Sequence, residues 1–160
     1  MIASKLATFE ALTRKANLFT EAAASDRDAA HPFDFRNIHP DLPADTRKLF
    51  DNGHFSQATF EAYKFLDEEV QRITGDEDFG KSLMMRMLGG DSPKLRLTPG
   101  MTATEKSEQE GYKFLFAGAM AALRNPRGHS THIVDDPDTC LDQLSFASML
   151  LRRLEEAGLR

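Results

Sequence analysis

The sequence has little of what marks secreted or membrane-spanning proteins. Its 160 residues include one cysteine, Cys140, so a disulfide within the chain is excluded. The longest apolar run, residues 114–123, is about half as long as a membrane-spanning helix needs. Residues 1–20 mix apolar and charged residues and lack the apolar core of a signal peptide. We therefore expect a cytoplasmic protein with no membrane partner.

Positive charge is also scarce. Lys and Arg together number 20 against 25 for Asp and Glu, which gives a formal net charge of −5. Such a chain does not coat nucleic acid through bulk charge. The stretch 124–132 is an exception, since it holds two arginines, two histidines and no acid. We therefore expect any contact with nucleic acid to be weak, salt-sensitive and confined to one groove.

The apolar residues recur at helical spacing along almost the whole chain, and no segment alternates as a strand does. Helices are predicted over about 3–19, 43–52, 54–74, 77–88, 102–125 and 137–157. The second half of the 102–125 helix is apolar on all sides, which predicts a central helix that Pro126 ends. The acidic run 67–69 is expected to form a solvated face. We expect residues 1–37 to form an N-terminal helix and connector, and residues 38–160 to form an all-α antiparallel bundle.

The stretch most suggestive of chemistry follows the predicted central helix, where Arg124 precedes His129 by five positions. Arginine offers a planar fork to a phosphate, and histidine moves protons near neutral pH. The spacing alone is common, since Arg127 and His132 form a second such pair. On a straight helix Arg124 and His129 would diverge, so we expect Pro126 to break the helix and let the chain fold back.

At these residues the sequence resembles the HEPN superfamily, and within it the Ymh-type conserved hypothetical proteins of bacteria and phages. The likeness covers about residues 38–155. The matching stretches are Ile38-His39-Pro40, Leu49-Phe50 with Gly53-His54-Phe55 and Ala58, Glu61-Ala62 with Lys64, Glu108 with Gly111, and Leu115-Phe116-Ala117-Gly118-Ala119-Met120 running into Arg124-Asn125-Pro126.

This resemblance implies a homodimeric helical bundle that brings the Arg/His motifs of two chains to one cleft. It implies a metal-independent endoribonuclease of toxin or anti-phage defence type, without a cofactor and with an antitoxin or defence protein as a candidate partner. Arg124 and His129 would be catalytic, and Asn125 the polar residue within the motif. Glu61 and Lys64 are either supporting groups in the cleft or an exposed ion pair at helical spacing.

In the expected mechanism, an RNA 2′-hydroxyl attacks the adjacent phosphate and leaves a 2′,3′-cyclic phosphate. Three alternatives stay open. One is a catalytically inactive HEPN-type module that binds nucleotide or RNA or mediates dimerisation, and another is a purely structural phage or host protein. The third is a metal site built from His129, His132, Asp135 and Asp136, which is the less favoured reading because no second cluster completes the ligand set.

Overall fold

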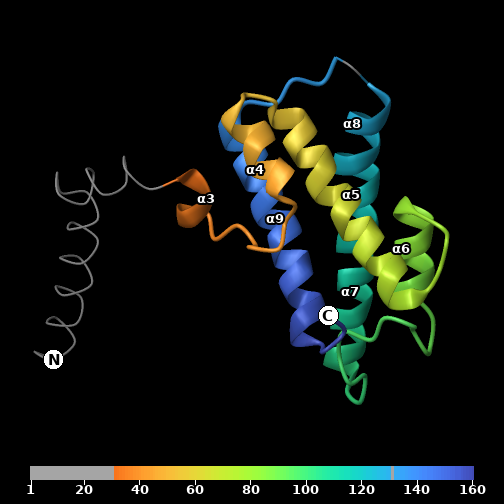
Figure 1. Ribbon diagram of the computed structural model, residues 1–160. Coiled ribbons are helices and arrows are strands. Elements are labelled where there is room, and N and C mark those ends of the chain that lie inside the picture. The colour runs from red at the N-terminus through yellow and green to blue at the C-terminus, as the bar shows by residue number, and fades with distance from the viewer. Residues whose placement is uncertain (1–30, 131) are drawn as a thin grey trace, which may run out of the picture. The chain divides into compact units, whose positions relative to one another are not determined.

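A computed structural model describes residues 31–130 and 132–160 (Figure 1). Residues 36–160 form one compact unit, which contains every helix discussed below except α3 (Pro32–Phe35). The helix predicted over residues 3–19 lies outside the described residues. No helix in the described part of the chain is both long and apolar enough to cross a membrane.

The predicted all-α bundle is confirmed, and the described residues contain no strand. The elements after α3 are α4 (Ala44–Asp51), α5 (Phe55–Thr74), α6 (Gly80–Leu88), α7 (Ala103–Ala119), the π-helix η1 (Met120–Arg124), α8 (Asn125–His129) and α9 (Pro137–Glu156). Apart from the segment around Pro126, these bounds lie within three residues of the sequence predictions.

Local capping chemistry explains several of the helix ends. The Thr102 side chain accepts from the backbone N–H of Glu105 at 3.2 Å, and the Glu105 carboxylate accepts from the N–H of Thr102 at 3.1 Å. This reciprocal capping box starts α7, as its sequence predicts. Asp136 caps α9 by accepting from the Thr139 N–H at 2.9 Å. Both caps satisfy backbone donors that a helix start leaves without partners.

Figure 1 shows three long helical segments: α5, α7 with its continuation through η1 and α8, and α9. Their buried apolar side chains form the core. The Tyr63 hydroxyl of α5 donates to the carbonyl of Gln143 in α9 at 2.8 Å, and these two helices run in the same direction. α7 runs antiparallel to both, so that Glu108 near its start bonds to Arg153 near the end of α9 at 2.9 Å. The large side chains that are fully buried come from α5, α6, α7, η1, α9 and the loop before α7. They are Tyr63, Leu66, Leu83, Met84, Leu88, Leu95, Phe116, Met120, Leu144, Leu150, Leu151 and Leu154.

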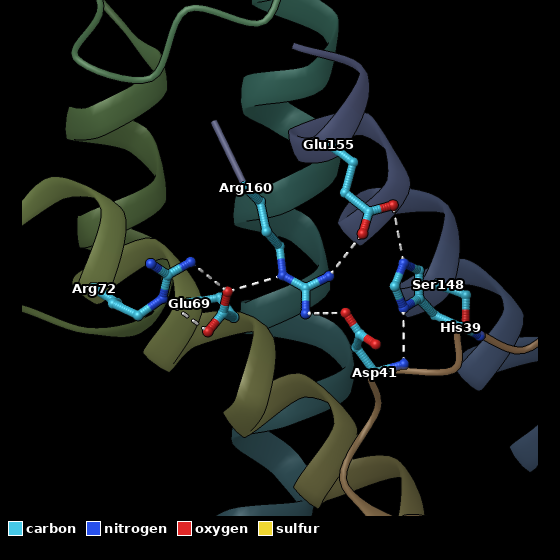
Figure 2. Close-up of polar contacts among 7 residues, drawn as sticks. All are labelled: His39, Asp41, Glu69, Arg72, Ser148, Glu155 and Arg160. Atoms are coloured by element: carbon cyan, nitrogen blue, oxygen red, sulfur yellow. Dashed lines mark hydrogen bonds and ion pairs between the residues drawn. The ribbon is translucent and has the colours of Figure 1, made fainter. Parts of the chain in front are cut away.

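A network of hydrogen bonds and ion pairs joins the segment before α4 to α5, α9 and the C-terminal Arg160 (Figure 2). The Arg160 guanidinium donates to Glu69, Glu155 and Asp41 at 2.9, 3.0 and 2.9 Å. His39 is buried, and its Nε2 lies 3.1 Å from Glu155 while its Nδ1 accepts from the Asp41 N–H at 3.1 Å. Because Nδ1 accepts, the proton of the neutral ring sits on Nε2 and is donated to Glu155.

The prediction that Pro126 ends the central helix is wrong. The backbone N–H of Asn125 bonds to the carbonyl of Met120, five residues earlier, and the helix then continues through Pro126 to His129. A proline ring within an ordinary α-helix clashes with the carbonyl four residues before it. The wider π-turn of η1 ends at Arg124, two residues before Pro126, which explains how the chain accommodates the ring without breaking.

The second half of the segment predicted as the central helix is not buried on all sides. One face stays exposed, and its members recur at helical spacing: Gly111, Phe114, Leu115, Gly118, Ala121 and Ala122. We call this set the α7 face. Phe114 is 57% and Leu115 42% exposed, which is unusual for large apolar side chains lying together on one helix. Another side of α7 packs on α6.

Candidate functional site

Arg124 stands at the end of η1, where it packs against α5 and the start of α6. Its side chain is 19% exposed, and its guanidinium carbon lies 5.7 Å from the ring centroids of both Phe60 and Phe79. The only hydrogen bond that the structure gives its guanidinium within the described residues is to the amide oxygen of Asn125, at a long 3.3 Å. Its Nε is buried without an acceptor. This guanidinium is therefore short of acceptors.

The nearest carboxylate to Arg124 is Asp67, whose Oδ2 lies 3.9 Å from Nη2. Asp67 is only 3% exposed, and both of its oxygens accept from the backbone N–H of Gly80, at 2.8 and 3.0 Å. Burial raises the pKa of this carboxyl, while the Gly80 N–H and the Arg124 charge act to lower it. The prediction that residues 67–69 form a solvated face is therefore wrong for Asp67.

Asn125, predicted as a supporting residue, lies beside the same cluster. Its Oδ1 accepts from Arg124 and would lie 4.0 Å from a β-carbon built on Gly80. The start of α6 thus approaches the end of η1 closely. The structure therefore brings three side chains together: those of Arg124, Asn125 and Asp67.

His129 ends α8 and is exposed. Because the helix runs unbroken from Arg124 to His129, the two residues are separated by about 140° around its axis. The fold-back that was expected to unite them within one chain does not occur. Arg124 points to α5 and α6, and His129 stands apart from that cluster.

Arg127, the first member of the second Arg/His pair, has a structural role. Its guanidinium makes a two-pronged ion pair with Asp135, at 2.7 and 2.6 Å, and both side chains are only 7% exposed. It also donates to the carbonyl of Leu123 at 2.9 Å. Asp135 is thereby engaged, and Asp136 caps α9, so the alternative metal set loses both of its carboxylates to other roles.

Another set of potential metal ligands occurs in the described residues, where donor atoms of His39, Asp41 and Glu155 lie within 4.8 Å of one another. The Arg160 guanidinium bonds to both carboxylates, and the Asp41 N–H occupies the Nδ1 of His39 (Figure 2). The position that a cation would take already has a cationic group, so these residues fit a structural network better than a metal centre.

Glu61 and Lys64, the other supporting residues, project from α5. Their charged atoms lie 3.7 Å apart, and Lys64 also lies 3.9 Å from Glu68. With the Lys64 side chain 46% exposed, this is the surface ion-pair geometry that the sequence allowed. Glu61 also lines an open groove of ≈ 560 Å³ beside α8, whose other walls include Phe60 and Gly128.

Sequence reasoning missed two residues of the cluster around Arg124, namely Asp67 and Phe79. Asp67 follows Tyr63 by four positions and precedes Val70 by three, so its helical position marks it as buried, although its acidic neighbours suggest otherwise. Phe79 carried no comparable signal, because it belongs to a short turn whose shape depends on Asp67.

Comparison with known proteins places most of the chain in one family. The sequence model described as "Protein of unknown function (Hypoth_ymh)" matches residues 36–154. The chain therefore belongs to the Hypoth_ymh family. No match was found among curated proteins or among solved structures.

Proposed function

We propose that this chain is a metal-independent endoribonuclease of HEPN type that acts as a homodimer in toxin or anti-phage defence systems. The observation that carries the proposal is the Arg124 guanidinium, which is largely buried, short of acceptors and 3.9 Å from its nearest carboxylate. A phosphate would supply the missing acceptors in the two-pronged geometry that arginine favours. The resemblance of the Arg124–His129 motif to HEPN ribonucleases gives the reaction class.

The α7 face supports the dimer. It lies on the same continuous helical segment as Arg124 and His129, and it leaves large apolar side chains exposed. Two copies packed through this face with these helices in the same direction would bury those side chains and bring their α8 segments near one another. Since Arg124 and His129 diverge within one chain, the complete site requires a second copy.

In the proposed reaction, His129 of one copy takes the proton from the 2′-hydroxyl, whose oxygen then bonds to the phosphorus. Arg124 stabilises the added negative charge of the phosphorane. The bond to the 5′-oxygen breaks as His129 of the second copy donates a proton to it. The products are a 2′,3′-cyclic phosphate and a 5′-hydroxyl.

The test is cleavage of single-stranded RNA in the presence of EDTA. We expect cyclic-phosphate ends from the natural sequence and at least a hundredfold loss with His129→Ala, the usual scale of acid–base catalysis. Arg124→Ala should lose activity as well. His132→Ala is the matched control, because His132 is also exposed and lies three residues away. Cleavage that requires a metal ion or survives His129→Ala would refute the reaction.

The dimer has its own test. A β-carbon added at Gly118 meets nothing within 4 Å, so Gly118→Glu should fold normally as a monomer. We expect light scattering to show a dimer for the natural sequence and a monomer for Gly118→Glu. Ser92→Glu adds the same charge to an exposed loop and should stay dimeric. A natural chain that is monomeric at high concentration would contradict the proposal.

One observation favours a second candidate, a catalytically inactive HEPN-type module that binds RNA or nucleotide. The continuous helix separates Arg124 from His129, whereas phosphate binding requires Arg124 alone. RNA binding that depends on Arg124, with no cleavage under any condition tested, would identify this module.

A further inference from the structure

Phe79 is an exposed aromatic side chain beside Arg124 that the proposed reaction does not use. It is 59% exposed, and its ring centroid lies 5.7 Å from the guanidinium carbon of Arg124. Its chain neighbours Glu77 and Asp78 are acidic, so the ring is not part of an apolar surface of the kind that docks a protein. A solvent-exposed aromatic ring beside a guanidinium that is short of acceptors matches a nucleic-acid base better than a protein surface.

The turn that carries Phe79 is firmly held. The Asp78 carboxylate accepts from the Phe79 N–H at 2.9 Å and bonds to Arg86 at 3.2 Å. On the other side, the N–H of Gly80 donates to the buried Asp67. Gly80 has a φ of +67°, which a side chain at this position would strain. Phe79 is thus presented to solvent by a fixed backbone.

We propose that Phe79 is the platform on which an unpaired base of single-stranded RNA stacks while the neighbouring phosphate binds Arg124. This inference rests on the proposed function and specifies its substrate class. Every base has a π face, so one aromatic ring beside a cationic group binds single strands with little sequence preference. A base within a duplex is already stacked on its neighbours and gains nothing from Phe79.

The experiment measures binding to a fluorescent single-stranded RNA whose 2′-oxygens are methylated, so that no nucleophile is present for cleavage. We expect Phe79→Ala and Phe79→Leu to weaken Kd by at least about fivefold, the lower end of base–aromatic stacking. Phe79→Trp should retain or strengthen binding. Met101→Ala removes another exposed apolar side chain, which lies outside the Arg124 cluster, and should change nothing. Circular dichroism of each variant checks that it has folded.

The outcomes separate this inference from the proposed function. Binding that is lost with Arg124→Ala but unchanged by Phe79→Ala overturns the role of Phe79 and leaves the proposed function standing. Binding restored by Phe79→Leu overturns it as well, because an aliphatic cover would then suffice. A natural chain that binds no RNA overturns both. Equal weakening of binding to a blunt duplex by Phe79→Ala would also contradict stacking.

Discussion

Removing Arg127 should destabilise the protein far more than removing an arginine at the surface such as Arg36. Arg127 and Asp135 are each only 7% exposed, and two hydrogen bonds of 2.7 and 2.6 Å join them. Arg127→Met leaves the Asp135 carboxylate buried without its counter-charge. Breaking a buried pair in this way costs about 3–5 kcal/mol. That is a large part of the roughly 5–15 kcal/mol by which domains are usually stable.

Urea unfolding followed by circular dichroism measures this cost. The double variant Arg127→Met with Asp135→Leu removes both charges, and we expect it to be more stable than Arg127→Met alone. Arg36→Ala is the control, because Arg36 pairs with Asp142 at the surface and its loss should cost no more than about 1 kcal/mol. The reasoning fails if Arg127→Met costs no more than Arg36→Ala, or if the double variant is the less stable of the two.

Two further predictions concern close packing and acid stability. A β-carbon on Gly128 would lie 2.8 Å from the Phe60 ring, so Gly128→Ala should destabilise by about 1 kcal/mol in thermal unfolding. Gly111 has open space around it, so Gly111→Ala should instead stabilise the protein by up to about 1 kcal/mol. Equal changes in stability for the two variants would contradict this reasoning. Hydrogen bonds from Arg72 first, and from Arg160, lower the pKa of Glu69. The stabilisation that ionised Glu69 gives the folded state is therefore present above the ordinary carboxyl pKa, and it is lost as pH falls through the lowered pKa. At pH 7, Glu69→Gln should be less stable than the natural chain by about 1–3 kcal/mol. This difference in unfolding free energy should shrink in acid, and a difference that does not depend on pH would refute the assignment.

Most of the fold could be predicted because its determinants are local. The capping box at Thr102, the Asp136 cap and the apolar stripe of α5 each act within a few residues. Pro126 was predicted to end the helix because the usual effect of a proline is also local. A π-turn places one extra residue in the helix, and no residue type in 120–124 announces it.

The candidate site was predictable in its residues but not in its arrangement. The motif identified Arg124, Asn125 and His129, and the structure brings the first two together while leaving His129 apart. The burial of Asp67 was not predicted because its acidic neighbours Glu68 and Glu69 indicate a solvated face. A buried residue four positions after Tyr63 faces the core whatever its charge, and its partner Gly80 lies thirteen residues away in sequence.

The net charge of −5 is compatible with phosphate binding because of how the arginines are distributed. In the part of the chain that the structure describes, most arginines bond directly to carboxylates: Arg36, Arg72, Arg86, Arg127, Arg153 and Arg160. Arg124 differs because Asp67 lies 3.9 Å away and is occupied by the Gly80 N–H. Asp67 thus attracts the Arg124 guanidinium electrostatically but accepts no hydrogen bond from it. An acidic protein can therefore keep one cationic group open to a phosphate, because within the described residues this guanidinium has no carboxylate bonded directly to it.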